Sequence, residues 1–206
     1  YGLRNLIELN ISHNKLYLLP YQTFESIRSV ESIDLSYNLL VSFLDNFFIH
    51  NSRLKVLQLH HNNLHTINKN LLYGLKDLHT LNLSHNQIFH VDRNSFDTLD
   101  GLQSLDLADN RIEELSGIVF LSLKKLQTID LSNNPIHQLP LGIFANQLQL
   151  SALHMDNTNI IRLSNWIDSI TNSTINQQIL SNLKHVSLRN STNLRHIESC
   201  FFFNLP

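Results

Sequence analysis

One asparagine recurs along this chain at a fixed interval of 24 residues. The recurring positions are Asn14, Asn38, Asn62, Asn86, Asn110 and Asn134, and each follows the apolar pattern L-x-x-L-x-L-x-x-N-x-L. A period of this length means that one structural unit is stacked many times, because a single unit of this size cannot bury its own apolar face. The sequence therefore predicts a solenoid.

Two further apolar columns lie outside the eleven-residue segment. Aligned residues fall three places after its end (Leu19, Phe43, Ile67, Val91, Leu115, Leu139, Leu163) and ten places after the asparagine (Phe24, Phe48, Leu72, Phe96, Phe120, Phe144). Together with the segment they resemble the leucine-rich repeat family, in particular its extracellular class with 24-residue units. The resemblance implies an α/β solenoid of horseshoe form, with a parallel β-sheet on the concave face and irregular or 3-10 segments on the convex face.

The strand columns also have a direct physical explanation. Alternation sends Leu9 and Ile11 to one face of a short strand and Asn10 to the other. Stacked strands form a parallel sheet, and the return path of about 13 residues carries Phe and Leu that enclose a core along the stack. The recurring asparagines are predicted to be structural, because each amide can both donate to and accept from backbone groups of neighbouring coils.

Two places depart from the period. A seventh segment begins at Leu150 and has Thr158 at the asparagine position, where a hydroxyl replaces only part of the amide's bonding. The next segment begins 33 residues later at Leu183, so the irregular repeat over 150–182 carries a nine-residue insertion. We interpret residues 1–206 as a single domain of about eight repeats, and we expect it to be a fragment of a longer ectodomain because neither end forms a cap.

Compartment can be argued from glycosylation sequons and cysteine usage. Asn-x-Ser/Thr occurs at Asn10 and Asn82, where the strand pattern creates it automatically, and at Asn172 and Asn190, in polar segments expected to be exposed. For the single Cys200, a partner outside this chain and a buried free thiol both stay open. No apolar run reaches the roughly 18 residues needed to cross a bilayer. With the resemblance, these features predict an extracellular glycoprotein, at the cell surface or secreted.

The variable strand positions form the surface on which a ligand is expected to bind. Acidic side chains gather on the fifth to seventh repeats, where the candidate binding residues are Asp106, Asp109, Asp130, His154 and Asp156. Such a neighbourhood can receive a basic protein ligand. The alternative is that short polar residues are simply what a closely spaced strand surface tolerates.

Other chemistries have weaker support in the sequence. His60, His61 and His85 lie on adjacent repeats and could bind a metal ion or respond to pH, but a histidine before the asparagine is common in the family, so we expect solvated turn residues and no metal or cofactor. Ser, His and Asp are abundant, yet nothing fixes them as a catalytic triad in a closed pocket, so no enzyme is predicted. With a net charge of −2 and dispersed Lys and Arg, a nucleic-acid partner is not expected.

The resemblance implies a role in extracellular recognition. The first hypothesis is the ligand-binding part of a cell-surface receptor, similar to the Toll-like receptor ectodomains, with a protein ligand or co-receptor and homodimerisation as a further option. The second is an adhesion or matrix protein of the chaoptin type that acts by self-association, and the third is a secreted structural or inhibitory protein. A transmembrane helix or lipid-anchor signal outside these residues would decide among them.

Overall fold

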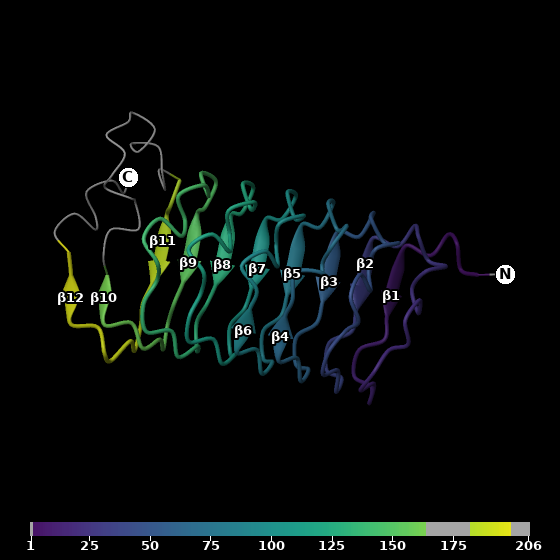
Figure 1. The fold of residues 1–206 in the computed structure, drawn as a ribbon, viewed down its shortest axis with the longest axis horizontal. Helices are drawn as coiled ribbons and strands as arrows, with labels where there is room; N and C mark the ends of the chain where they lie inside the picture. The colour runs from purple at the N-terminus through teal and green to yellow at the C-terminus, as the bar shows by residue number, and fades with distance from the viewer. Residues whose placement is uncertain (1, 164–181, 199–206) are drawn as a thin grey trace.

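The computed structural model describes residues 2–163 and 182–198, and over these residues the chain winds into an elongated solenoid (Figure 1). Each coil contributes one short strand to a single sheet and then returns over the other side. The solenoid predicted from the 24-residue period is therefore confirmed. The insertion that includes Asn172, and also Cys200, lie outside the described residues.

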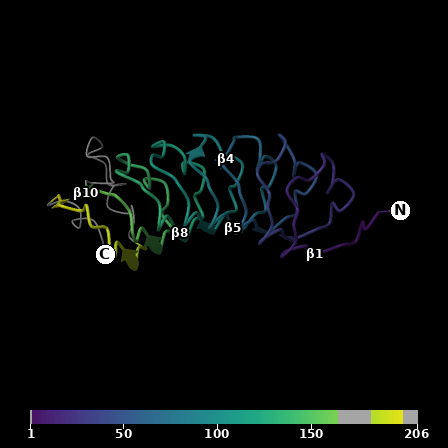
Figure 2. The same ribbon diagram turned by 90° about the horizontal axis from the view of Figure 1, so that it is seen from below.

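The main sheet has eight strands in the order β1-β2-β3-β5-β7-β8-β9-β11. Its strands are β1 (Glu8–Asn10), β2 (Ser32–Asp34), β3 (Val56–Gln58), β5 (Thr80–Asn82), β7 (Ser104–Asp106), β8 (Thr128–Asp130), β9 (Ala152–His154) and β11 (His185–Ser187), and they define coils 1 to 8. Every neighbouring pair is parallel and in register, so equivalent positions of successive repeats stand in straight columns. The sheet lines the concave side of the arc (Figure 2).

Two short strand pairs lie beyond the main sheet on the return path. They are β4 (Thr66–Ile67) with β6 (His90–Val91), and β10 (Arg162–Leu163) with β12 (His196–Ile197), both parallel. The remaining return segments of the described residues are turns and irregular backbone without a helix, as expected for the convex side. Within 2–163 and 182–198, no helix has the length and apolarity needed to span a membrane.

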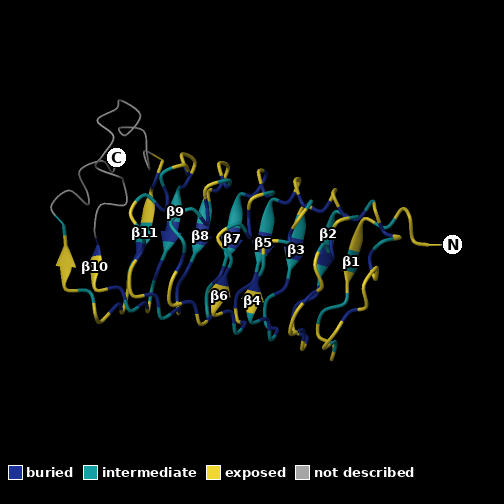
Figure 3. Ribbon diagram, in the orientation of Figure 1, coloured by how far each residue is buried: buried dark blue, intermediate teal, exposed yellow. Residues whose placement is uncertain are grey.

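The core runs the length of the solenoid between sheet and return path. The central strand residues, for example Ile33, Leu57 and Leu81, are fully buried because alternation points them away from the concave surface. On the convex side the phenylalanine column stacks from coil to coil, with ring centroids 6.1 Å apart for Phe96 and Phe120. Exposed residues gather at the turns along both edges (Figure 3).

The recurring asparagines join neighbouring coils through their amides. The Asn86 Nδ2 donates to the carbonyl of Leu59 on the preceding coil and to that of Leu83 on its own coil, each at 3.0 Å, while its Oδ1 accepts from the Leu64 amide at 3.0 Å. The same three-way pattern occurs at Asn38, Asn62, Asn110 and Asn134. Asn14 of coil 1 is exposed and bonds only to carbonyls of its own coil. The amides thus satisfy backbone groups that strand pairing does not reach.

In coils 7 and 8 hydroxyls take the place of the amide. Thr158 donates to the carbonyl of Met155 at 3.1 Å, and its hydroxyl lies 3.1 Å from that of Ser191, which occupies the asparagine position of coil 8. Ser191 also donates to the Met155 carbonyl at 3.3 Å. The sequence identified the substitution at Thr158 but not its pairing with Ser191, because the insertion separates the two residues by 33 positions.

Candidate functional site

Each strand leaves the sheet through a residue in the left-handed backbone conformation. These residues have φ between 51° and 56° and are His13, Tyr37, His61, His85, Asp109, Asn133, Asn157 and Asn190. Asn, Asp and His adopt this conformation more readily than other non-glycine residues, whereas a bulky aromatic residue such as Tyr37 rarely does. These eight residues, which we term the turn column, place polar or aromatic side chains along one edge of the concave sheet.

The structure brings three of the five candidate acidic-site residues into one column. Asp106 on β7 is in register with Asp130 on β8, and Asp130 is in register with His154 on β9. Neighbouring strands of a sheet are about 4.8 Å apart, so the two carboxylates face the concave surface side by side. Burial, and secondarily the Asp130 charge, raise the pKa of Asp106 above its ordinary value, although the Ala108 amide bonds its ionised form.

Both carboxylates also cap the turn that follows their strand. Asp106 Oδ1 accepts from the Ala108 amide at 3.0 Å, and Asp130 Oδ1 accepts from the Ser132 amide at 2.8 Å. A neutral amide makes the same bond in coil 4, where Asn82 Oδ1 accepts from the Ser84 amide at 2.9 Å. A neutral amide oxygen can therefore make this bond, so the turn does not require a negative charge at this position.

The other two candidate residues lie elsewhere and have protein partners. Asp109 belongs to the turn column, where its Oδ2 accepts from Asn133 Nδ2 at 3.1 Å and lies 3.6 Å from His85 Nε2. Asp156 Oδ1 accepts from the Ser187 hydroxyl and the Arg189 amide of coil 8. Burial opposes ionisation of Asp156, but these two bonds and the Arg189 charge outweigh it and lower its pKa. Asp156 thus connects coil 7 to coil 8 across the insertion.

An aromatic stack fills the turn column of coils 1 to 4. His13 and Tyr37 stack at 4.2 Å between ring centroids, Tyr37 and His61 at 4.1 Å, and His61 and His85 at 4.1 Å, with interplanar angles of 8° to 15°. We term these four residues the ring column. The histidines lie in turns and are exposed or half-buried, as expected, but the sequence did not predict that coil stacking places their rings face to face.

The ring column has the wrong geometry for chelating a metal ion. The nitrogen lone pairs of imidazole lie in the ring plane, so parallel stacked rings direct them side by side and not toward a common point. Among the residues that the structure describes, no group of three or more His, Cys, Asp or Glu is placed to hold a metal ion.

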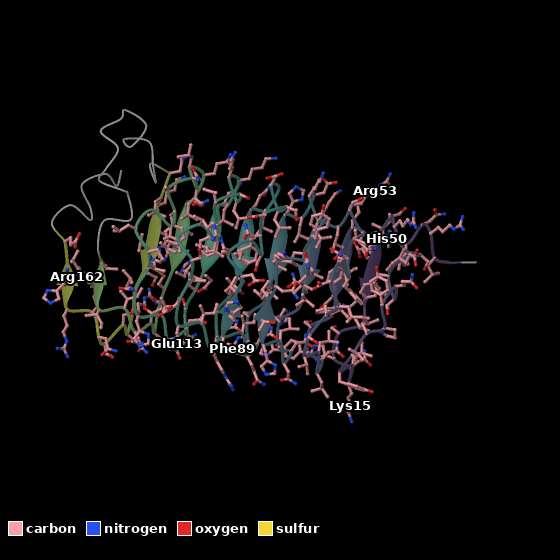
Figure 4. The ribbon with its side chains drawn as sticks, viewed as in Figure 1. Lys15, His50, Arg53, Phe89, Glu113 and Arg162 are labelled. Carbon is pink, nitrogen blue, oxygen red and sulfur yellow. The ribbon has the colours of Figure 1, made fainter. Side chains whose placement is uncertain are left out.

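The sequons fall at three different kinds of surface. Asn10 is exposed at the first strand, and Asn82 is half-buried in the middle of the concave face. Asn190 is exposed in the turn column of coil 8. Figure 4 shows a further edge of the solenoid, on which Lys15, Phe89 and Glu113 point outward from the segment that follows each asparagine.

The repeat pattern matches a known family over most of the chain. Leucine rich repeat segments match residues 1–40, 28–88, 52–112, 76–136 and 100–160. The chain belongs to the leucine-rich repeat family. The family predicted from the repeated asparagine is thus confirmed, and the coils described above are its repeats.

Similar proteins share either part of the sequence or the fold. Tsukushi of Xenopus tropicalis is 45% identical over 56 residues, and Tsukushi-A of Xenopus laevis is 43% identical over 56 residues. Each match covers 27% of this chain and 16% of the relative, so the chain spans only a small part of these proteins.

Two solved structures superpose on nearly the whole chain. TLR13 in its complex with ssRNA13 matches with a TM-score of 0.75 and 25% identity, covering 98% of this chain and 35% of TLR13. The Drosophila Toll–Spatzle complex matches with a TM-score of 0.76 and 23% identity, covering 98% of this chain and 30% of the other. The RNA and Spatzle are partners of those proteins.

Proposed function

We propose that this leucine-rich repeat chain is the binding part of an extracellular recognition protein that acts without catalysis. Among the three hypotheses, we favour a cell-surface receptor. The Toll and TLR13 structures support this reading through a shared fold and a bound partner in each. The similarity to Tsukushi over 56 residues supports it for that part of the chain. The alternative is a leucine-rich repeat adhesion or matrix protein that binds a second copy of itself.

The observation that carries the proposal is that Asp106 and Asp130 carry negative charges that their turn bonds do not require. An asparagine makes the same turn bond at position 82, so the fold alone does not require carboxylates in coils 5 and 6. Two like charges in register raise the cost of ionising both. A guanidinium or ammonium group placed between them would offset that cost, so the pair is suited to a Lys or Arg side chain of a protein ligand.

The sequons favour the same half of the concave face. Glycans on Asn10 and Asn82 would project from the strands of coils 1 and 4 and obstruct the surface around them. Residues 102–163, which form coils 5 to 7, contain no sequon. Because Asn82 is in register with Asp106, its glycan would border the acidic pair on the side of coil 4, and a partner would approach from the side of Asp130 and His154.

RNA is the competing ligand class, because the TLR13 complex contains it. Carboxylates repel phosphate groups, and nucleic-acid affinity depends on Lys and Arg that neutralise phosphates. The acidic pair therefore favours a basic protein segment as the ligand of this surface.

The first prediction tests the acidic pair with the double variant Asp106→Asn/Asp130→Asn. Asparagine retains the turn bonds, so the variant should stay folded but lose at least about tenfold in affinity for an arginine-rich peptide, because both charges are removed. The matched control is Asp34→Asn, since Asp34 Oδ1 caps the coil 2 turn in the same way at 2.9 Å. Isothermal titration calorimetry, with single-stranded RNA as a second probe, measures the affinities.

Three outcomes contradict the proposal for this surface. They are unchanged peptide affinity in the double variant, an equal loss in the Asp34→Asn control, and tighter binding of the RNA than of the peptide by the unmodified protein. Sedimentation of the same samples addresses the alternative role, since concentration-dependent dimers would favour self-association.

A further inference from the structure

The ring column joins coils 1 to 4 through backbone as well as side chains. The Tyr37 amide donates to the His60 carbonyl at 3.0 Å, the His61 amide to that of Ser84 at 3.1 Å, and the His85 amide to that of Ala108 at 2.9 Å. Each turn is therefore bonded to the next coil at the residue whose ring is stacked. Loss of the stack would act directly on these bonds.

Stacking also stabilises an unfavourable backbone conformation at Tyr37. Its φ of 52° is in the left-handed region, which is unfavourable for a bulky residue. Its ring lies between those of His13 and His61 at 4.2 and 4.1 Å. The contacts on both faces help to hold the turn in this conformation.

The surroundings of the inner imidazoles disfavour a positive charge. Burial is the main cause that lowers the pKa of His61, and the neighbouring His85 and His60 lower it further. Burial likewise lowers the pKa of His60, against the opposing carboxylates of Asp34 and Asp106. The titratable groups that act on these two imidazoles are His13, Asp34, His85, Asp106 and Asp109, with Tyr37 in ring contact with both.

We propose that the ring column is a proton-operated latch along the edge of coils 1 to 4, closed when its imidazoles are neutral and opened when adjacent imidazoles become charged. The column can stay closed when His85 alone is protonated, because Asp109 lies 3.6 Å from His85 Nε2 and can serve as its counter-ion. A second proton on His61 would place two cations 4.1 Å apart between ring centroids. Rings carrying like charges at this distance repel each other, and the stack separates.

Coils 5 to 7 of the turn column can be compared with the ring column of coils 1 to 4 in the same protein. There the side chains are joined by Asn133 Nδ2 donating to Asp109 Oδ2 at 3.1 Å and by Asn157 Nδ2 donating to Asn133 Oδ1 at 2.6 Å. Side-chain amides do not titrate, and no imidazole lies in this part of the column, whose one carboxylate is that of Asp109 beside His85. Mild acid should therefore open the edge of coils 1 to 4 and leave that of coils 5 to 7 closed.

The direction of the pH dependence follows from the lowered pKa of His61. An opened or unfolded turn has an imidazole with the ordinary value of 6.5 and binds protons more readily than the closed one. The stabilisation by the stack is therefore complete above this value and is lost as the pH falls below it.

The second prediction is tested by amide hydrogen exchange of the whole chain at about pH 7.5 and about pH 5.5. After correction for intrinsic exchange, the amides of Tyr37 and His61 should lose several-fold in protection at the lower pH, because the opened turn binds protons more readily than the closed one. The amides of Asn133 and Asn157, which donate to Asp156 and Arg189, should be unchanged. Equal changes at both sets of amides, or no change at either, would overturn the latch.

Variants separate the stack from a general effect of histidine charge. His85→Gln removes the neighbouring imidazole, so the His61 midpoint should rise and the acid-induced loss of protection should become smaller, whereas exposed His137→Gln on coil 6 should change neither. Imidazole proton shifts in the unmodified protein give a second readout that does not depend on the variants folding. A His61 midpoint that is not below the ordinary value of 6.5 would also refute the proposal.

Discussion

At the scale of single residues, asparagine suits its recurring position because one side chain supplies both a donor and an acceptor. Asn86 uses them on three backbone groups of two coils, at Leu59, Leu64 and Leu83. Asn14 is also an asparagine at the same position of its repeat. It is exposed, however, and makes no bond to the backbone of another coil. The contribution of the amide thus depends on the bonds that it makes to a neighbouring coil.

The third prediction compares Asn86→Leu with Asn14→Leu by urea unfolding. Leucine cannot bond to the backbone groups that Asn86 satisfies, and each buried group left without a partner costs about 1–3 kcal/mol. The free energy of unfolding should therefore fall several times more in Asn86→Leu than in Asn14→Leu. The backbone partners of Asn14 can bond to water instead. Similar losses for the two variants would show that the amide bonds between coils contribute little.

At the scale of the element, no coil can be stable alone. Each strand of the main sheet has three residues, and the return path has no helix among the described residues, so a coil is held by the coils on either side. Phe120 illustrates this dependence, because its ring lies between Phe96 at 6.1 Å and Phe144 at 5.8 Å and is fully buried.

The fourth prediction is that Phe120→Ala lowers the free energy of unfolding by about 3–5 kcal/mol, because it removes a buried ring and leaves a cavity between two coils. Phe89→Ala is the matched control. Phe89 is 58% exposed, so its removal should change stability by less than about 0.5 kcal/mol. Calorimetric unfolding of both variants measures the difference, and a small loss at Phe120 would mean that the phenylalanine column is not a main source of coil-to-coil stability.

At the scale of the whole molecule, the concave face and its edge have two chemically different halves. The ring column occupies the edge of coils 1 to 4, while Asp106 and Asp130 lie on coils 5 and 6. The sequons at Asn10 and Asn82 fall in the first half. We therefore expect protonation and glycosylation to affect the first half and ligand binding to affect the second.

The fifth prediction concerns glycans on the concave face. Peptide mass mapping of the protein secreted from eukaryotic cells should find glycans on Asn10, Asn82 and Asn190, because all three lie in sequons on the surface of the solenoid. Enzymatic trimming of these glycans should increase the affinity of the arginine-rich peptide, because Asn82 is in register with Asp106 and its glycan borders the acidic pair. Unmodified Asn10 and Asn82 would contradict the proposed shielding.

The repeat alone determines the stacked architecture, the buried columns and the role of the asparagines. Each of these features requires the same residue type at the same place in every unit, so periodicity reveals it without coordinates. The candidate acidic residues could also be placed on consecutive coils, because their positions in the repeat are known. Their bonding partners could not.

Only the tertiary structure decided how the five candidate residues differ and which turn residues interact. Asp109 bonds to Asn133 and lies beside His85, whereas Asp156 bonds to Ser187 on the far side of a long insertion. The stack of His61 on His85 was likewise hidden, since the sequence shows two exposed turn histidines 24 residues apart. In both cases the outcome depends on side-chain direction and on the exact approach of neighbouring coils, and these are set only when the coils pack against each other.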